Sequence, residues 1–460
     1  MKIAVLSGSP KGKLSVSLQS VNYIKKYFPD HEYEIFHISQ AIQKLESDTQ
    51  KMDRIINSIE KASLVVWVTP VYYFTVPSQY KRFIEYIFNN DCKEIFKKKF
   101  SAVITTSINF FDNIAHEYMR GICDDLDMKF AGSFSAESDD LLIEKERTRL
   151  LSFAEDVFNN VLSNSFSPRA FHPVIVYDHS FTASGKPQKK INNRKIKMCL
   201  IQDRDYSGTN LGNMIENFKG MFEKKPESVN LTEIDIKGGC LGCVQCAFDH
   251  KCVYEKKDDF VNFYKSKILA SDILIFAGEI KDRFLSAKFK EYFDRTFFNS
   301  HTPVLAGKQI GLITSGPYSQ LHSLKTIINS YSEIQRANFA GFVSDEEKDN
   351  SIIEKSIQSL GERLVRYHEK KYIKPATFLG IGGHKIFRDD TWGKHRFVFQ
   401  ADHKFYEENG LYDFPQNDER AKKTNQTMME LTENPEMREA IRKELKTGMV
   451  SHHLKVVKEK

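Results

Sequence analysis

Apolar and polar positions alternate on two length scales along most of the chain. Short apolar runs of strand length occur at residues 2–6 and 64–68, whereas residues 16–27, 49–61 and 78–88 carry apolar positions at helical spacing. This alternation predicts β-α-β units, which assemble into a parallel sheet with helices on both faces. Ligand-binding loops of such sheets follow the carboxyl ends of the strands, so a site is expected in the loops after the first, third and fourth strands.

The same pattern occurs twice in the chain. The run KIAVL at residues 2–6 is matched by KMCLI at residues 197–201, and KFSAVITTS at residues 99–107 is matched by KQIGLITSG at residues 308–316. Matching blocks follow one another in the same order, and the second copy holds an insertion of about a dozen residues. We therefore predict two tandem α/β domains, each a doubly wound parallel sheet, followed by a mostly helical tail.

The repeats divide the chain into four parts. We predict a first domain over residues 1–165, a linker over 166–194, a second domain over 195–372 and a carboxy-terminal extension over 373–460. The linker is assigned because it holds several prolines and little periodicity. The insertion of the second domain is a cysteine-rich loop at residues 238–252.

The extension lies beyond the second repeat and shows one clear helix. Asn434 is a suitable N-cap for this helix and Gly448 is expected just beyond its end. The glycines at 380–383 lack the spacing of a dinucleotide-binding loop. The histidines at 384, 395 and 403 show no metal-ligand spacing, so we expect them to be packed or exposed.

Composition narrows the class of protein. The chain has 460 residues, 41% of them apolar and 28% charged, which describes a soluble globular protein. No apolar run is long enough to cross a bilayer and no export signal is visible, so we expect a cytoplasmic protein without a membrane partner. Lys and Arg exceed Asp and Glu by only 67 to 61 and are spread along the chain, which gives no reason to expect a nucleic acid.

The cysteine-rich loop is the strongest chemical signal. Its spacing is C-x2-C-x2-C-x5-C, formed by Cys240, Cys243, Cys246 and Cys252. Three thiols in close succession favour a [4Fe-4S] cluster, whereas structural zinc usually takes two separated C-x2-C pairs or substitutes a histidine, for which His250 is available. Redox-active thiols and thiols without a metal are the two other interpretations.

The loop after the first strand predicts an anion site. Residues 7–18 (SGSPKGKLSVSL) join a strand directly to a helix, so backbone N–H groups and the positive end of the helix dipole meet several hydroxyls there. Phosphate is the natural ligand. The alternative is a hydrophilic turn in which Ser15 only caps the helix.

These loops resemble those of a known family. The motif GSPKGxxSVSLQ and the run TPVYYF at residues 69–74 are similar to the flavodoxin-like NAD(P)H-dependent FMN reductases, over roughly residues 1–160 and 195–370. The cysteine loop resembles that of the iron-sulfur flavoproteins, a branch of the same superfamily. The resemblance implies two flavodoxin-like domains. It also assigns the FMN phosphate to Ser9, Lys11, Ser15, Val16 and Ser17, the flavin ring to Pro70, Val71, Tyr72 and Phe74, and the loop after the fourth strand to Thr106, Ser107 and Asn109.

Physical reasoning supports a flavin at the aromatic turn. A flavin ring is flat and largely apolar with a polar edge, so it binds well between aromatic faces and a few backbone amides. The alternative is that the aromatic side chains of residues 72–74 only cover the sheet edge.

The second domain keeps only part of this pattern. Asp203 and Asp205 stand near the place where a phosphate would bind, and two carboxylates repel an anion unless Arg204 compensates their charge. The sequence therefore leaves open whether this domain binds FMN. The candidate residues there are Ser207, Thr209, Asn210, Ser315 and Gly316.

The resulting prediction is an FMN-dependent oxidoreductase that moves electrons between NAD(P)H, or an iron-sulfur centre, and a small acceptor such as a quinone, a flavin or a redox protein. No catalytic side chain is named, because the flavin carries the chemistry. The alternatives are a non-enzymatic electron-transfer flavoprotein and a zinc-stapled scaffold without redox activity. Since single-copy relatives pair as dimers, we expect the two repeats to form a pseudo-dimer within the chain that brings the cysteine loop to the FMN; further homo-oligomerisation is left open.

Overall fold

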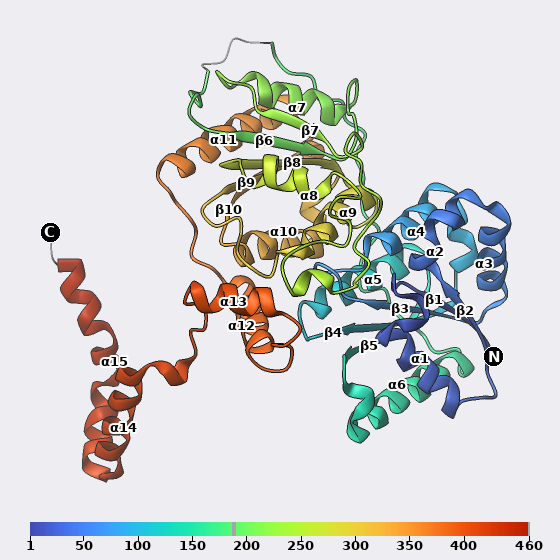
Figure 1. Ribbon diagram of the computed structural model, residues 1–460, viewed down its shortest axis with the longest axis horizontal. Coiled ribbons are helices and arrows are strands. Elements are labelled where there is room, and N and C mark those ends of the chain that lie inside the picture. The colour runs from blue at the N-terminus through green and yellow to red at the C-terminus, as the bar shows by residue number, and fades with distance from the viewer. Residues whose placement is uncertain (186–189, 459–460) are drawn as a thin grey trace. The chain divides into compact units, whose positions relative to one another are not determined.

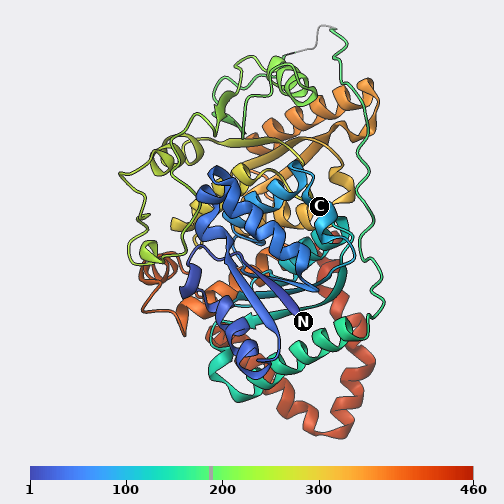
Figure 2. The same cartoon turned by 90° about the vertical axis from the view of Figure 1, so that its right-hand side faces the viewer.

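The computed structural model describes residues 1–185 and 190–458, and the chain forms two units, Met1–Lys404 and Phe405–Lys460. The first unit holds both predicted domains and the start of the extension. Residues 186–189 of the predicted linker and 459–460 of the extension lie outside the described residues. The segment that follows the first half runs as extended chain along the outside of both halves (Figure 2).

The first half of this unit is a five-stranded parallel sheet with strand order β2-β1-β3-β4-β5 (Figure 1). Its strands are β1 (Lys2–Ser7), β2 (Glu32–His37), β3 (Leu64–Pro70), β4 (Phe100–Ser107) and β5 (Lys129–Glu137). Its helices are α1 (Val16–Tyr27), α2 (Ile38–Ser47), α3 (Thr49–Lys61), α4 (Ser78–Asn89), α5 (Asp112–Asp125) and α6 (Glu144–Leu162).

The second half has a sheet of the same kind, also parallel, with order β7-β6-β8-β9-β10. Its strands are β6 (Met198–Gln202), β7 (Glu227–Asn230), β8 (Ile273–Glu279), β9 (Gln309–Ser315) and β10 (Asn338–Ser344). Its helices are α7 (Asn210–Gly220), α8 (Phe260–Phe263), α9 (Ala287–Arg295), α10 (His322–Ile334) and α11 (Asn350–Glu369). Both sheets follow the order 2-1-3-4-5, so the predicted fold class of two doubly wound, flavodoxin-like sheets with a helical extension is confirmed.

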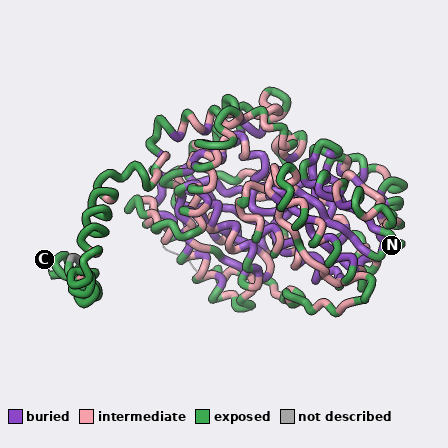
Figure 3. The backbone as a smooth tube through the Cα atoms, turned by 90° about the horizontal axis from the view of Figure 1, so that it is seen from below, coloured by how far each residue is buried: buried purple, intermediate pink, exposed green. Residues whose placement is uncertain are grey.

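The sequence pattern explains the cores. Strands β1 and β3 are buried almost throughout, because helices cover both faces of a parallel sheet. One face of the first sheet packs against α1 and α6 through side chains such as Ile3, Leu18 and Val157. The core on its other face continues without a break into the second half, where it includes Phe289 and Tyr292. Figure 3 shows the buried segments concentrated in these two halves.

Helix α4 of the first half packs on helix α9 of the second half, and a buried lysine on each helix bonds to the other half. Lys81 on α4 bonds to Glu85 one turn later and to Asp282 of the second half, both at 2.7–2.8 Å. Lys290 on α9 pairs with Asp294 one turn later and donates to the Tyr72 carbonyl of the first half at 2.8 Å. The two lysines therefore play equivalent roles across the junction.

The extension begins with α12 (Phe378–Trp392), which packs against α10. Its glycines are packing positions: a Cβ on Gly383 would lie 2.9 Å from the Ile334 side chain and 3.3 Å from Phe110. Helix α13 (Gln400–Glu408) follows.

The second unit holds α14 (Glu419–Glu433) and α15 (Pro435–Lys458). Asn434 caps α15 as predicted, because its side chain accepts from the N–H groups of Glu436 and Met437. The predicted end at Gly448 is wrong: α15 continues through it, since one helical glycine costs only about 1 kcal/mol. Among the described residues, none of the helices has the length and apolarity needed to cross a membrane.

Candidate functional site

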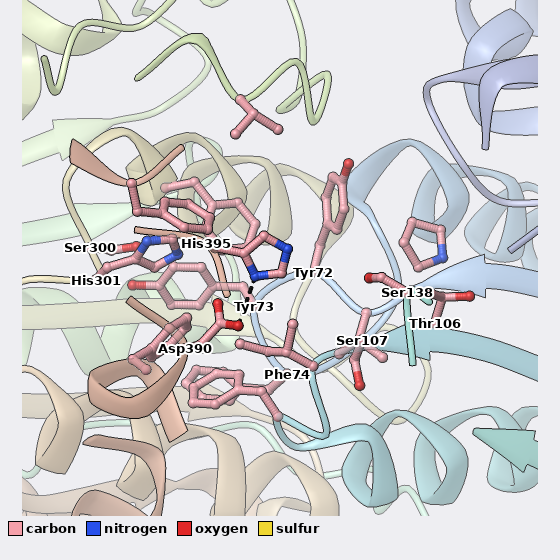
Figure 4. A pocket seen from close by; sticks show the side chains of 18 of the residues that line it. Tyr72, Tyr73, Phe74, Thr106, Ser107, Ser138, Ser300, His301, Asp390 and His395 are labelled. Carbon is pink, nitrogen blue, oxygen red and sulfur yellow. Dashed lines mark hydrogen bonds and ion pairs between the residues drawn. The ribbon is translucent and has the colours of Figure 1, made fainter. Parts of the chain in front are cut away.

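A cavity of about 380 Å³ opens at the carboxyl edge of the first sheet (Figure 4). The loops after β1, β3 and β4 meet there, as the strand order requires. Eleven of the twelve predicted flavin residues of the first half line this cavity: Ser9, Lys11, Ser15, Val16, Ser17, Pro70, Val71, Tyr72, Phe74, Thr106 and Ser107. Asn109 is not among the lining residues. It adopts φ +59° and donates its N–H to the Ser107 hydroxyl at 3.0 Å, so it shapes the loop.

The loop after β1 has the geometry of an anion site. Ser15 is the N-cap of α1, and its hydroxyl accepts from the N–H of Leu18 at 3.4 Å. Ser9 accepts from the N–H of Lys11 at 3.3 Å, which folds the loop back toward the helix. The side chains of Ser9, Ser15 and Ser17 are buried, although all three line the cavity. Hydroxyls, helix N–H groups and the Lys11 ammonium therefore converge on one end of the cavity.

The aromatic turn after β3 is conformationally strained. Tyr72 and Thr75 exchange backbone hydrogen bonds of 2.7 and 3.0 Å, and the two residues between them, Tyr73 and Phe74, have φ of +40° and +72°. Such values are unfavourable for aromatic residues, and strain of this kind is concentrated at functional sites. The Lys290 bond to the Tyr72 carbonyl holds the turn in place.

Three buried polar atoms of residues that line the cavity have no hydrogen-bond partner among the described residues: the hydroxyls of Thr106 and Tyr331 and the Oε1 of Gln335. The hydroxyl of Thr106, at the end of β4, is buried without a hydrogen bond within the described part of the chain. A buried hydroxyl in this state costs free energy unless a ligand satisfies it. The residues present therefore fit a flavin, whose polar edge carries both donors and acceptors.

The cysteine loop of the second half lies directly on this site. A Cβ on Gly242 would fall 1.7 Å from the Tyr72 hydroxyl and 3.1 Å from the Lys11 side chain. Val244 lines the cavity, and Gln79 of the first half donates to the carbonyl of Cys240 at 3.1 Å. Residues 240–244 are thus neighbours of the predicted flavin residues.

The four thiols do not form a metal site as they are placed. Within residues 1–185 and 190–458, no three His, Cys, Asp or Glu side chains converge as metal ligands would. Cys240 accepts from the N–H of Gly242 at 3.4 Å, and Cys252 accepts from Arg295 at 3.9 Å. Burial raises the pKa of the Cys240 thiol. Burial and the neighbouring Cys252 together raise the pKa of the Cys246 thiol to about 12. The iron-sulfur cluster and its zinc alternative are therefore not supported by this arrangement.

His250, the alternative zinc ligand, is held elsewhere. Its Nε2 lies 2.9 Å from one oxygen of Asp402, and the other oxygen of Asp402 lies 3.0 Å from Nδ1 of His301. Although burial by itself raises the pKa of Asp402, the two imidazoles lower it to about 2. The bridge ties the cysteine loop to the wall of the cavity.

The side of the cavity opposite the flavin loops, which we call its far wall, could not be predicted from the sequence. It is built by the second half and the extension, from Phe297, Ser300, His301, Tyr331, Ile334, Gln335, Phe387, Asp390, His395, Val398 and Phe399. The sequence predicts that His395 is packed or exposed, whereas it lines the cavity with its Nδ1 2.7 Å from Asp390 (Figure 4). No spacing signal marks this wall, because its residues come from segments far apart in the chain.

The second half has a cavity of about 580 Å³ at the equivalent edge of its sheet, lined among others by Ser315, Gly316 and Asp345, but its polar groups are bonded differently. The hydroxyl of Ser315 and the amide of Asn210 both bond to the carboxylate of Asp345, which also accepts from the N–H of Gly316 at 2.8 Å. Thr209 caps α7, and its hydroxyl donates to the Tyr206 carbonyl. Ser207 is bonded to Asp205. The donors predicted for a second FMN are therefore already used by carboxylates and carbonyls of the chain.

Comparison with known proteins gives one family match. Residues 1–139 match the model of the NADPH-dependent FMN reductase family, which agrees with the predicted enzyme class, an NAD(P)H-dependent FMN oxidoreductase. No curated protein matches the chain.

Several solved structures resemble parts of the chain. The Trp repressor binding protein of Bacillus subtilis has 20% identity over 33% of this chain and 97% of its own, with a TM-score of 0.26. General stress protein 14 of Treponema denticola, solved in complex with FMN, has 11% identity over 36% of this chain and 100% of its own, with a TM-score of 0.28. FerB of Paracoccus denitrificans, a flavoenzyme NAD(P)H:(acceptor) oxidoreductase, has 18% identity over 34% of this chain and 97% of its own, with a TM-score of 0.27.

Proposed function

We propose that the protein is an FMN-dependent oxidoreductase that transfers electrons from NAD(P)H to a small acceptor. The observation that carries this proposal is the convergence of three loops on one cavity: eleven residues predicted from sequence motifs line it together. The cavity belongs in large part to the segment that matches the family of FMN reductases.

Each part of the cavity has a role in this proposal. Ser9, Ser15, Ser17 and Lys11 hold the phosphate, together with the N–H groups at the start of α1. The turn at residues 70–74 holds the ring, and the buried Thr106 hydroxyl bonds to its polar edge. Bound FMN supplies the capacity to accept a hydride and pass electrons on. The protein binds and orients it.

One FMN per chain is the expected stoichiometry. In the second half, Asp345 takes the hydrogen bonds of Asn210, Ser315 and Gly316 that a flavin would need. A fixed carboxylate at this position also repels a phosphate.

An enzyme is favoured over a simple electron carrier by the far wall of the cavity. A carrier needs only an exposed flavin edge, whereas here side chains of the second half and the extension wall the cavity opposite the flavin loops. Enclosed space of this kind suits a substrate.

We also propose that the two halves arose by duplication and act as a pseudo-dimer within the chain. Their identical strand order and the equivalent roles of Lys81 and Lys290 support this relationship. The second half would then contribute the cysteine loop to the flavin site of the first half.

The chemistry of the cysteine loop is a separate question. An iron-sulfur cluster, zinc and free thiols make different predictions for protein purified without oxygen: iron with acid-labile sulfide, stoichiometric zinc, or four titratable thiols. No step of the proposed reaction depends on the answer.

Reconstitution tests the proposed function. Purified protein incubated with FMN is expected to retain one flavin per chain and to oxidise NAD(P)H steadily when ferricyanide is present. Retained flavin without NAD(P)H oxidation would favour the electron carrier, and no retained flavin would refute the assignment.

A further inference from the structure

The helix pair α14 and α15 of the second unit has no core of its own (Figure 1). None of the described residues of these two helices is buried, and the half-buried ones are Ala421, Thr432 and Ile441. Most of the stability of a helix in a protein comes from packing of its apolar face against another surface. The apolar side chains of this pair are therefore available to a further surface.

Residues 449–458 of α15 form an amphipathic segment, which we call the basic apolar segment. At about 100° per residue, five of its apolar side chains fall within an arc of about 160° on one side of the helix, together with one polar residue, His453. Their exposed fractions run from 47% to 78%. Contiguous exposed apolar patches of this kind mark interaction sites. The five residues are Met449, Val450, Leu454, Val456 and Val457.

This segment becomes apparent only from the structure. The sequence predicts that α15 ends at Gly448, which would leave residues 449–458 without a defined face. Because the helix continues to Lys458, apolar positions that look scattered along the sequence share one side. The earlier apolar positions of α15 lie on a different side, so one straight groove of a partner protein would not cover both sets. These earlier positions are Met437, Ile441 and Leu445.

The ionised side chains around the segment are all basic. Between Leu445 and Lys458 the chain has no Asp or Glu, whereas Lys446, Lys455 and Lys458 each carry a positive charge. Lys455 and Lys458 lie across the helix from the apolar arc. The formal net charge of the whole chain, +6, has the same sign. An apolar face accompanied by lysines is complementary to a surface that is anionic outside and apolar within.

This combination distinguishes between the surfaces that could cover the segment. A second copy of the chain would bring the same lysines together, and like charges repel. Protein interfaces are dominated by Trp, Tyr and Arg, whereas Leu and Val are under-represented among their strongest contacts. The segment offers only Met, Leu and Val on its apolar side. Aliphatic side chains of a helix that lies in the plane of a membrane insert into hydrocarbon without a shaped pocket.

We propose that the basic apolar segment of α15 binds the surface of membranes that contain anionic phospholipids. The five aliphatic side chains insert among the acyl chains, while Lys455 and Lys458 remain at the phosphate groups. This is binding to the membrane surface and not membrane spanning, for which none of the described helices qualifies. It differs from the expectation of no membrane partner, because that expectation rests on apolar runs and not on a helical face. The inference goes beyond the proposed function and does not depend on FMN.

Sedimentation of the full chain with lipid vesicles tests the charge of the segment. Vesicles of phosphatidylcholine with about 30% phosphatidylserine should bind the protein at least about tenfold more tightly than phosphatidylcholine alone, and salt should weaken this binding. Lys455→Gln with Lys458→Gln should weaken binding about 25-fold, roughly fivefold for each lysine. The matched control removes the same charge from two exposed lysines of α1, Lys25→Gln with Lys26→Gln, and should change binding less than about twofold.

The apolar side is tested with a second pair of variants. Leu454→Gln with Val457→Gln should weaken binding to the anionic vesicles at least about tenfold, since binding scales with the apolar area that is buried. Glutamine favours a helix, so the fold of α15 is kept, and circular dichroism checks this. The control replaces two exposed apolar residues of α14, Met429→Gln with Leu431→Gln, and should change binding less than about twofold.

Loss of binding in both segment variants and its retention in both controls would support the proposal. It would be overturned by wild-type protein that does not bind anionic vesicles at millimolar lipid, or by unchanged binding in either segment variant. It would also be overturned if analytical ultracentrifugation without lipid showed association of copies that Leu454→Gln with Val457→Gln abolishes, because the segment would then be an interface between copies. Failure to retain FMN refutes the proposed function and leaves the vesicle result unaffected.

Discussion

Asp294 on helix α9 of the second half accepts a hydrogen bond of 2.7 Å from the backbone N–H of Ser78, the first residue of helix α4 in the first half. Glu85 on α4 returns the contact by accepting from the N–H of Ala287, the first residue of α9, also at 2.7 Å. Each helix thus carries a carboxylate that satisfies a free N–H at the start of the other. This exchange fixes the orientation of the two halves, and therefore the position of the cysteine loop over the cavity.

The junction is predicted to depend on the charge of Asp294. Burial raises the pKa of Asp294 and lowers that of Lys290, and neither side chain is exposed. Asp294→Asn leaves the ammonium of Lys290 buried without a counter-charge, which costs about 3–5 kcal/mol. Urea denaturation should show this loss of unfolding free energy. Glu216→Gln, in the exposed Lys219–Glu216 pair, should change it by less than about 0.5 kcal/mol. A loss below about 1 kcal/mol for Asp294→Asn would contradict this view of the junction.

The phosphate loop can be tested with a matched pair of caps. Ser15 caps α1 at the predicted FMN site, and Thr209 caps α7 at the equivalent place in the second half. Ser15→Ala and Thr209→Ala should each lower stability by about 1 kcal/mol. Only Ser15→Ala should also weaken FMN binding, by about tenfold, through loss of a hydrogen bond to a charged group. Equal FMN affinity of the two variants in fluorescence titrations would show that the Ser15 hydroxyl does not bind FMN.

The contact between the cysteine loop and Tyr72 gives a third prediction. Gly242 has φ +63° and leaves no room for a Cβ beside the Tyr72 hydroxyl, whereas Gly208 has φ +75° and no atom within 4 Å of the added Cβ. Alanine at either position costs about 1 kcal/mol of backbone strain. Gly242→Ala should in addition displace Tyr72 or the loop and weaken FMN binding, and Gly208→Ala should not. Equilibrium FMN titration of both variants decides; an unaltered affinity in Gly242→Ala would show that the contact is irrelevant to the flavin.

The Asp402 bridge predicts a specific pH dependence. Its pKa is about 2 in the folded protein, below the ordinary value of 3.8. A lowered carboxyl pKa stabilises the protein above the ordinary pKa, and this stabilisation is lost as the pH falls from about 4 to about 2. Wild type should therefore exceed Asp402→Asn in unfolding free energy by about 2 kcal/mol at neutral pH, and the difference should shrink in that acid range. Asp235→Asn, at a half-exposed carboxylate, is the control. A difference that is independent of pH would refute the bridge.

The sequence predicts those site residues that directly follow a strand. Ser15 and Tyr72 follow strands whose apolar pattern is plain, so their meeting at one sheet edge could be predicted from topology alone. Phe387 and His395 could not be assigned in this way, because their contact with the first half depends on how α12 packs on α10. Tertiary packing of this kind leaves no periodic signal along the chain.

The second half shows another limit of prediction from sequence, which concerns the hydrogen-bond partners of its carboxylates. The sequence places the carboxylate of Asp203 near a phosphate, whereas in the structure Asp203 is buried and accepts a hydrogen bond of 2.6 Å from the Tyr206 hydroxyl, and burial raises its pKa. The carboxylate that takes the ligand's place is Asp345, which follows the last strand of the sheet. Sequence spacing reveals that a carboxylate is present, but not which donors it reaches.

In the proposed site the loop after β1 holds the phosphate of FMN, and a parallel titration with FMN and riboflavin tests this role most directly. The two ligands share the ring and differ only in the phosphate. We predict one FMN per chain with a Kd in the micromolar range or below, and riboflavin at least about tenfold weaker, since the phosphate adds charge-assisted hydrogen bonds. Equal binding of the two ligands, or no binding of either at tens of micromolar, would contradict the account.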